Sequence, residues 1–543
     1  MKNISKTFFL FLFTYHLSLV LSFSQTAPAI EWQNTIGGNN DDELYSIHQT
    51  SDGGYILGGT SSSNISGDKT ENSNGGEDYW MVKTDAWGNI QWQNTIGGSD
   101  GDELLSIQQT SDGGYILGGI SSSNISGDKT ENNWDPTFIT GDYWIVKTDA
   151  FGNIQWQNTI GGSSWEELWC ISQTTDGGYI LGGISNSNIS GDKTENKIGS
   201  GDYWIVKIDS LGNIQWQNTI GGSNSEWLYS IQQTSDGGYI LGGYSESGIS
   251  GDKTENNVGG SDYWIVKLDT SGNIQWQNSI GGSDFDLLFS VQQTTDGGYI
   301  LGGSSWSHIS GDKTENCIGG VADYWIVKTD ASGNIQWQNT IGGTKFERPY
   351  SIKQTVDGGY IVGGYSESGI SGDKTENCLG QYDYWIVKTN ATGNIQWQNT
   401  IGGSGIDFFY TMQQTTDSGY ILGGWSFSSI SGDKTENSMG GDYWIIKLYP
   451  DTITGIPNYQ TLTFNFQFSP NPLTSQSTFT FSNPQKNKFT FSLYDITGRV
   501  IETAFTTSDK LILKKENKQQ GVYFYKLENS VSGEKFNGKI ILQ

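Results

Sequence analysis

An acidic motif, D-K-T-E-N, occurs seven times in this chain and supplies oxygen atoms that could bind a cation. Ca²⁺ prefers several hard carboxylate and amide oxygens. The motif therefore suggests Ca²⁺ sites, with candidate ligands Asp68, Glu71, Asn72, Asp128, Glu131, Asp192 and Glu195. It lacks the D-x-D-x-D-G pattern of a calcium loop, and Asp and Asn also stabilise loops by bonding their own backbone. A loop-scaffold role is the favoured alternative.

A second set of acids could perform hydrolysis. One acid precedes the Ser, Cys or Thr of each predicted first strand by four residues: Asp42, Asp102, Glu166, Glu226, Asp286, Glu347 and Asp407. Two carboxyl groups at a suitable separation hydrolyse glycosidic bonds. The sequence does not give that separation, so a polysaccharide-active enzyme using Asp42, Glu166, Glu226 or Glu347 stays an alternative.

Irregular aromatic residues interrupt the repeats and could stack on sugars. The candidates for ligand binding are Trp134, Trp165, Trp227, Trp306 and Trp425. Exposed aromatic patches are typical of binding surfaces. Packing between neighbouring loops is the alternative, because Trp is buried on average.

Other catalytic chemistry has few candidate residues. Only His48 and His308 follow the predicted signal peptide, and neither has a repeated partner, which argues against a His-based nucleophilic or zinc site. The odd cysteine count and the spacing of Cys170, Cys317 and Cys378 predict free thiols. The D-G-G acids, Asp52 in the first copy, are interpreted as hairpin-turn residues.

The elements that must position these residues are predicted by a repeat. W-Q-N-[TS]-I-G-G recurs with spacings of 60, 64, 60, 60, 61 and 60 residues. In the first copy, four runs rich in β-branched and aromatic residues predict strands: Glu43–Thr50, Gly54–Thr60, Tyr79–Thr84 and Ile90–Ile96. All length variation lies between D-K-T-E-N and the following D-Y-W, in one long loop per copy.

The two ends of the repeat region predict a closed ring. The chain begins with an unpaired fourth strand over 30–37, and its last copy ends with a third strand over 443–448 and has no fourth. Joined, these ends complete seven blades. We therefore predict an all-β fold, a seven-bladed β-propeller of four-stranded blades with the ends joined in the last blade, an architecture that leaves only short, protected edges.

Connectivity and composition predict where the charge lies. The second-to-third and fourth-to-first loops should share one side of the ring. In each of the seven copies that side carries four repeated acidic positions and one repeated Lys, which gives a charge of −21. The chain carries 30 Lys and Arg against 58 Asp and Glu, a net charge of −28. Such a surface repels nucleic acid and anionic lipid, so no nucleic-acid partner is expected.

The N-terminus predicts export. Residues 1–24 combine Lys2 and Lys6, an apolar run and small residues before Gln25, as in a signal peptide. No other apolar run is long enough for a membrane span, so no integral membrane segment is expected after its removal. The predicted divisions are 1–24 signal peptide, 25–449 propeller, 450–463 linker and 464–543 C-terminal domain.

The last eighty residues predict a small Ig-like β-sandwich and carry specific motifs. These are S-P-N-P at 469–472, L-Y-D-I-T-G-R-V at 493–500, G-V-Y-F-Y at 521–525 and K-I-I-L at 539–542. Together they resemble the C-terminal type A sorting domain of type IX secretion cargo (Por secretion tail). The motif residues are Pro470, Asn471, Pro472, Gly498, Arg499, Gly521, Tyr523 and Lys539.

That resemblance implies the type IX secretion machinery as a partner and a secreted or outer-membrane surface location. The repeats loosely resemble kelch-type blades, and more closely the propeller repeats of secreted proteins in the Bacteroidota. We expect a non-enzymatic module that binds glycan or surface protein through its long-loop side. A secreted glycoside hydrolase and a structural adhesin-like spacer are the alternatives.

Overall fold

The computed structural model describes residues 26–135, 141–451, 467–469, 472–481, 483, 486–495, 499–516, 518–529 and 535–542. Every regular element in these ranges is a β-strand. The chain divides into two compact units, Met1–Thr454 and Gly455–Gln543. The predicted signal peptide and most of the predicted linker lie outside the described residues.

The first unit consists of seven four-stranded antiparallel sheets, which we call blades 1 to 7 in chain order. The first strands are β2 (Asp42–Gln49), β6 (Asp102–Gln109), β10 (Glu166–Gln173), β14 (Glu226–Gln233), β18 (Asp286–Gln293), β22 (Glu347–Gln354) and β26 (Asp407–Gln414). The second strands are β3 (Tyr55–Ser61), β7 (Tyr115–Ser121), β11 (Tyr179–Ser185), β15 (Tyr239–Ser245), β19 (Tyr299–Ser305), β23 (Tyr360–Ser366) and β27 (Tyr420–Ser426).

The third strands are β4 (Asp78–Thr84), β8 (Asp142–Thr148), β12 (Asp202–Ile208), β16 (Asp262–Leu268), β20 (Asp323–Thr329), β24 (Asp383–Thr389) and β28 (Asp442–Leu448). The fourth strands are β5 (Ile90–Ile96), β9 (Ile154–Ile160), β13 (Ile214–Ile220), β17 (Ile274–Ile280), β21 (Ile335–Ile341), β25 (Ile395–Ile401) and, for blade 7, β1 (Ile30–Ile36). The predicted strands of the first copy match these bounds to within about one residue.

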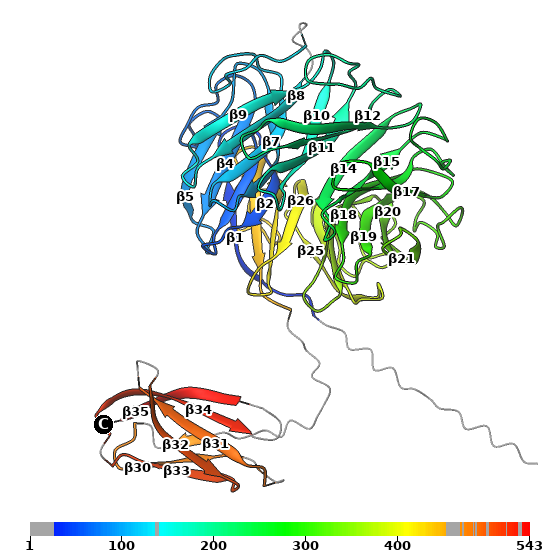
Figure 1. The fold of residues 1–543 in the computed structure, drawn as a ribbon. Coiled ribbons are helices and arrows are strands. Elements are labelled where there is room, and N and C mark those ends of the chain that lie inside the picture. The colour runs from blue at the N-terminus through cyan, green and yellow to red at the C-terminus, as the bar shows by residue number, and fades with distance from the viewer. Residues whose placement is uncertain are drawn as a thin grey trace, which may run out of the picture. The chain divides into compact units, whose positions relative to one another are not determined.

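The predicted ring closure is confirmed, because β1 pairs antiparallel with β28 from Ile30↔Leu448 to Ile36↔Tyr443. In Figure 1 the blue N-terminal strand lies beside the yellow-orange strands of the last blade. The first strands of neighbouring blades contact one another all the way around, so they surround the ring axis. The first unit is a seven-bladed β-propeller.

Apolar side chains from adjacent blades form the core. The Trp of each D-Y-W motif is fully buried, and Tyr79 of blade 1 lies 4.8 Å, centroid to centroid, from Trp144 of blade 2. The Tyr79 hydroxyl donates to the carbonyl oxygen of Trp144 at 2.9 Å. The same pair of contacts recurs between neighbouring blades, so each blade is held by its neighbours as well as by its own sheet.

The second unit has two sheets, as predicted for a small β-sandwich. One contains β29 (Gln467–Ser469), β30 (Gln476–Thr480) and β33 (Lys510–Lys514), and the other has the order β32 (Val500–Thr506), β31 (Phe489–Tyr494), β34 (Gly521–Asn529) and β35 (Lys535–Leu542). Their facing side chains form one core, in which Phe479 and Phe491 have ring centroids 4.9 Å apart.

Within the described parts of the chain, no helix is long and apolar enough to cross a membrane. The three cysteines are free thiols, as predicted.

Candidate functional site

The D-K-T-E-N side chains hold the loops to the fourth strands. The Gly37 amide donates to Asp68 Oδ2 at 3.3 Å, the Thr95 amide to Glu71 Oε2 at 2.7 Å, and the Ile65 amide to Asn72 Oδ1 at 3.0 Å. The equivalent bonds recur at Asp128, Glu131, Asp192 and Glu195. Among the described residues, no group of three or more His, Cys, Asp or Glu side chains is placed to hold a metal ion. These contacts favour the scaffold interpretation, and Ca²⁺ binding stays a prediction.

The predicted hydrolytic acids do not lie on the surface, and this placement was wrong. Asp42, Glu166, Glu226 and Glu347 have no exposed side-chain surface. Glu347, for example, accepts hydrogen bonds from the Gly343 amide at 3.1 Å and the Ser366 hydroxyl at 2.8 Å. These carboxyl groups are therefore buried inside the ring and cannot reach a polysaccharide.

Each buried acid meets a second one from the preceding blade, the Asp of the D-Y-W motif. We call these the seven carboxyl pairs: Asp442/Asp42, Asp78/Asp102, Asp142/Glu166, Asp202/Glu226, Asp262/Asp286, Asp323/Glu347 and Asp383/Asp407. All fourteen side chains are at most 1% exposed, and so are most of the nearby D-K-T-E-N lysines. The predicted charge of −21 on the long-loop side is therefore too large, because only the Asp68 and Glu71 columns remain outside.

Trp134 lies apart from the other candidate tryptophans. It is 47% exposed, and its Nε1 donates to Asp192 Oδ2 in the next blade at 2.7 Å. A shallow cavity of about 460 Å³ is lined by Trp134 with Glu131, Asp192, Asn132, Asn133, Asn158 and Thr159. The structure thus brings three of the predicted site residues together, as one aromatic ring beside two carboxylates.

The other four candidates, Trp165, Trp227, Trp306 and Trp425, belong to one chain of ring contacts across blades 3 to 7. Trp165 lies 5.8 Å from Trp227, and Trp227 stacks on Tyr244 at 6.3 Å. Trp425 lies 4.9 Å from Phe408. We call this chain the aromatic belt; its members are Trp165, Trp227, Tyr229, Tyr244, Phe289, Trp306, Phe346, Tyr350, Tyr365, Phe408 and Trp425.

Part of the belt surrounds the ring axis. The fourth residue of each first strand is Tyr45, Leu105, Trp169, Tyr229, Phe289, Tyr350 or Tyr410, and six of the seven are aromatic. Neighbouring rings touch, with centroids 4.9 Å apart for Tyr45 and Tyr410 and 4.7 Å apart for Trp169 and Tyr229. These side chains surround the axis at the centre of the propeller, and three of them, Tyr229, Phe289 and Tyr350, also belong to the belt.

Three glutamates lie beside the belt, on blades 1 to 3. Glu43, Glu103 and Glu167 each occupy the second position of a first strand, where blades 4 and 7 carry Trp227 and Phe408. In the described structure none of the three glutamates forms an ion pair. Burial, with the neighbouring charge of Glu103, raises the pKa of Glu167 to about 8.

Arg348 occupies the same second position in blade 6. Its guanidinium lies 5.4 Å from the centroid of Phe289 and 5.3 Å from that of Phe346, so it stacks within the belt. The long-loop end of the axis is therefore aromatic and cationic on blades 4 to 7 and acidic on blades 1 to 3. We call this surface the axial face.

Sequence reasoning missed the glutamates, Phe408 and most of the tyrosines of the axial face. For the glutamates and Phe408 the signal was present as the one variable position between the invariant acid and the apolar third residue of each first strand. The tyrosines lie elsewhere, at the fourth residue of a first strand or on a second strand. The ring brings the seven copies of the variable second position together around the axis. Variation there therefore changes one shared surface, whereas variation in a loop changes only that loop.

The opposite side of the propeller carries hairpin turns, as predicted. Asp52 Oδ1 accepts hydrogen bonds from the Thr50 hydroxyl at 2.5 Å and the Gly54 amide at 3.0 Å, and its carboxylate pairs with Lys83 at 3.0 Å. Burial would raise the pKa of Asp52, but these hydrogen bonds and Lys83 hold it at about 2. The ion pair recurs in all seven blades and serves the turn.

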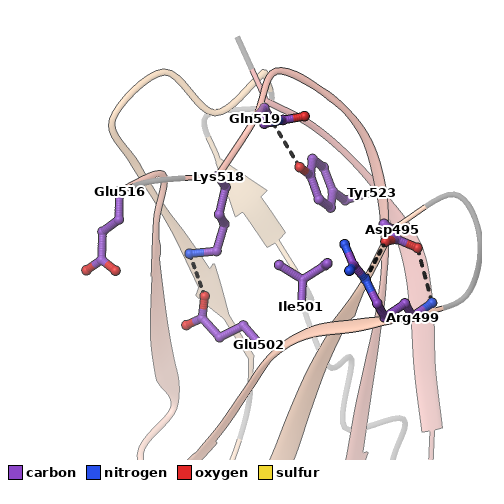
Figure 2. A pocket seen from close by; sticks show the side chains of 8 residues that line it. All are labelled: Asp495, Arg499, Ile501, Glu502, Glu516, Lys518, Gln519 and Tyr523. Atoms are coloured by element: carbon purple, nitrogen blue, oxygen red, sulfur yellow. Dashed lines mark hydrogen bonds and ion pairs between the residues drawn. The ribbon is translucent and has the colours of Figure 1, made fainter.

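The second unit contains a cavity of about 610 Å³, lined by Asp495, Arg499, Ile501, Glu502, Glu516, Lys518, Gln519 and Tyr523. Figure 2 shows Arg499 directed at Asp495, Lys518 at Glu502, and the Tyr523 hydroxyl at the backbone of Gln519. Arg499 Nε lies 3.1 Å from Asp495 Oδ2, and Lys518 Nζ lies 2.6 Å from Glu502 Oε2. The cavity therefore has paired charges of both signs.

Two of the predicted sorting residues, Arg499 and Tyr523, line this cavity. Gly521 begins β34 and Lys539 lies exposed on β35, while Pro472 is half-buried beside Leu473. The Leu473 amide donates to the Ile541 carbonyl oxygen at 2.7 Å, which joins the S-P-N-P segment to the final strand. Pro470, Asn471 and Gly498 lie outside the described residues.

Comparison with known proteins identifies the second unit. Residues 467–543 match the family model described as a secretion system C-terminal sorting domain. Over 270 residues the chain is 24% identical to the regulatory protein FlaEY of Caulobacter vibrioides, covering 46% of this chain and 28% of that protein. The chain thus spans less than a third of that relative's length.

A solved structure of PorZ is also similar to this chain. It is described as an essential bacterial surface component of the type IX secretion system of Porphyromonas gingivalis. The TM-score is 0.39 with 10% identity, over 93% of this chain and 60% of that one. From the sorting-domain match at its C-terminus, the chain is a secreted or cell-surface protein carrying a type IX secretion signal.

Proposed function

We propose that the propeller is a non-enzymatic glycan-binding module, and that its axial face is the binding surface. The observation that carries this proposal is the continuous aromatic belt, in which Trp227, Phe408 and several tyrosines are half-buried and so keep part of each ring accessible. Aromatic rings offer flat apolar faces to sugar rings. Glu43 and Glu103 beside them supply acceptors for hydroxyl groups.

The belt is suited to an extended ligand because it crosses several blades. Most of its members lie on β14, β15, β18, β22, β23, β26 and β27 of blades 4 to 7, and Trp165, Trp306 and Phe346 lie in the adjoining loops of blades 3, 5 and 6. Binding sites combine apolar and aromatic walls with a few polar groups that set orientation. A surface protein is the second ligand class that the same face could bind.

Removing rings from the belt should weaken binding. We expect the Trp227→Ala and Phe408→Ala variants to weaken binding of the best polysaccharide on a glycan array by about tenfold or more each, since buried aromatic anchors dominate binding energy. Trp87→Ala is the matched control, because Trp87 is 68% exposed on a hairpin turn on the opposite side. Equal affinities for all three variants would refute the assignment.

A carboxylate-pair hydrolase is the second candidate, and one observation favours it. The raised pKa of Glu167 keeps this carboxyl protonated near neutral pH beside Glu103 on the preceding blade, as a general acid requires. Hydrolysis of the bound polysaccharide that is lost in Glu167→Gln, with binding retained, would favour this candidate. Binding without hydrolysis would favour the non-enzymatic binding module. No binding on the glycan array, with surface adhesion intact, would indicate a structural adhesin-like spacer.

Export should depend on the second unit. We expect deletion of residues 464–543 to trap the propeller in the periplasm, because the sorting domain is what the type IX machinery recognises in proteins of this family. Cell fractionation with immunoblotting measures this. Deletion that leaves surface display normal would contradict the role proposed for this unit.

A further inference from the structure

The seven carboxyl pairs place acids against acids in the buried interfaces between blades. In the pair Asp323/Glu347, Asp323 Oδ2 accepts a hydrogen bond from the Ile318 amide at 2.5 Å, and both oxygens of Glu347 are occupied by Gly343 and Ser366. The two carboxyl groups also lie within hydrogen-bonding distance of each other, as in the pairs Asp142/Glu166 and Asp202/Glu226, while the acids of the four Asp/Asp pairs interact electrostatically. Two ionised carboxylates repel each other at this separation, and burial strengthens the repulsion.

One oxygen in several pairs has no donor. Within the described structure, Oδ1 is buried without a hydrogen-bond partner in Asp78, Asp142, Asp323 and Asp442. The backbone of the first Gly in the I-G-G motif covers this oxygen, so solvent cannot reach it. A Cβ on Gly342 would lie 2.0 Å from Asp323 Oδ1. A buried acceptor without a donor is costly. A proton on one carboxyl group of the pair would supply the missing donor.

The charges around the ring balance only with such a proton. The lysines of D-K-T-E-N alternate with the pairs: Lys69 interacts with Asp42 and Asp78, and Lys129 with Asp102 and Asp142. Lys69 is 1% exposed, donates to the Thr95 hydroxyl at 2.9 Å and lies over the Trp80 ring. Fourteen carboxylates against seven ammonium groups would leave seven buried negative charges; one proton per pair leaves none.

We propose that each of the seven carboxyl pairs is a proton-binding site that binds one proton at the interface between neighbouring blades, and that in the three Asp/Glu pairs the two carboxyl groups share this proton. Loss of these protons weakens every blade interface, so the ring is a pH-sensitive structure. The inference is independent of the function proposed for the axial face.

The other titratable groups facing a pair do not replace the proton. Around Asp323/Glu347 they are Lys313, Cys317, Lys374 and Tyr324, whose hydroxyl donates to the Trp385 carbonyl oxygen. Asp128 and Asp68 add negative charge near Asp78 and Asp442. The lysines therefore neutralise one negative charge per pair. The surrounding acids disfavour a second negative charge on the same pair.

The direction of the pH dependence follows from the pKa values. Burial, followed by the partner acid, raises the pKa of the third-strand Asp residues to about 6 in Asp202, about 7 in Asp78 and Asp442, and about 8 in Asp323. A group with a raised pKa contributes stability that is complete below its unfolded value near 4 and is lost as pH rises through the folded value. The lysine pKa values are lowered to about 8, which acts in the opposite direction only above that pH.

The test compares the full mature chain with two double variants. Asp78→Asn with Asp442→Asn replaces the protonated partner of two pairs by an isosteric amide, and Asp85→Asn with Asp149→Asn is the matched control at two half-buried turn acids whose pKa values are lowered. Between pH 5 and pH 8 we expect the wild-type and control melting temperatures to fall on the order of 10 °C. The fall should be smaller by roughly two sevenths in the first double variant.

Infrared spectroscopy provides a direct readout that does not need a variant to fold. At pH 6 ordinary carboxyl groups are ionised, so a protonated carboxylic acid band that disappears by pH 9 reports the seven pair protons together with the proton on Glu167. We expect this band in the wild type and a loss of about a quarter of it in the Asp78→Asn, Asp442→Asn variant. Absence of the band at pH 6 would overturn the proposal, as would identical melting profiles for the two double variants.

Discussion

A mature chain that begins at Gly38 will lose the closed ring and melt at a much lower temperature than the full propeller. The truncation removes β1, which supplies the fourth strand of blade 7 and the ladder from Ile30 to Ile36 against β28. It also removes the acceptor for Trp444 Nε1, which is Gln33 Oε1 at 3.0 Å, and the Thr35 hydroxyl that accepts from Lys434 at 2.8 Å. We expect a fall of more than about 10 °C, with a broadened transition.

Scanning calorimetry measures this effect, and a chain beginning at Pro28 is its control. That shorter truncation keeps all of β1 and the bond from the Tyr449 amide to the Ala29 carbonyl oxygen. It should melt like the full chain. Equal melting of both truncated chains would mean that the pairing of the two ends contributes nothing to stability.

Replacing Gly119 by Ala will destabilise the propeller by about 3 kcal/mol or more. The added methyl group would clash with backbone atoms of a neighbouring strand, which cannot move aside as a flexible side chain could. A Cβ on this residue of β7 would lie 1.9 Å from the Glu103 carbonyl oxygen and 3.0 Å from the Tyr79 hydroxyl. The first contact is backbone in the adjacent strand, and the second is held by its bond to Trp144. The variant should unfold at lower denaturant concentration.

Gly101→Ala provides the matched control in the same blade. Nothing lies within 4 Å of a Cβ at Gly101, so its substitution should change the free energy of unfolding by less than about 0.5 kcal/mol. Urea unfolding followed by tryptophan fluorescence compares the two. If both variants unfold at the same midpoint, the close approach at Gly119 is relieved by a shift of the strands.

Most of the fold was predictable because it repeats. The runs around Tyr55 and Trp80 alternate with Gly, Asn and Asp turns in every copy, so seven copies of one local signal predicted the same four strands. Ring closure followed from the two incomplete ends, the strand at Ile30 and the missing partner of Tyr443. The β-sandwich was likewise predictable from short alternating strands, and the sorting domain from motifs of adjacent residues. The match of residues 467–543 to the sorting-domain family agrees with them.

The candidate site was predictable only in part. Trp165, Trp227, Trp306 and Trp425 were identified as departures from the repeat, but their union in one belt depends on contacts between different blades. Glu167 was not identified, because a glutamate next to an invariant acid looks the same in sequence whether it faces the axis or a loop. The ring places seven such positions at one centre, and no local pattern contains that distance.

The amino-acid sequence by itself determined the number of blades, the strands within each, the joining of the two ends and the identity of the sorting domain. These depend on local periodicity and on motifs, which are properties of neighbouring residues in one chain. Only the tertiary structure decided that Asp42, Asp78 and Lys69 are buried while Asp68 and Glu71 remain outside. A carboxyl group becomes buried when the next blade covers it, and its charge and role then depend on a partner in that blade, 24 residues away for Asp78 and Asp102 and 400 residues away for Asp442 and Asp42.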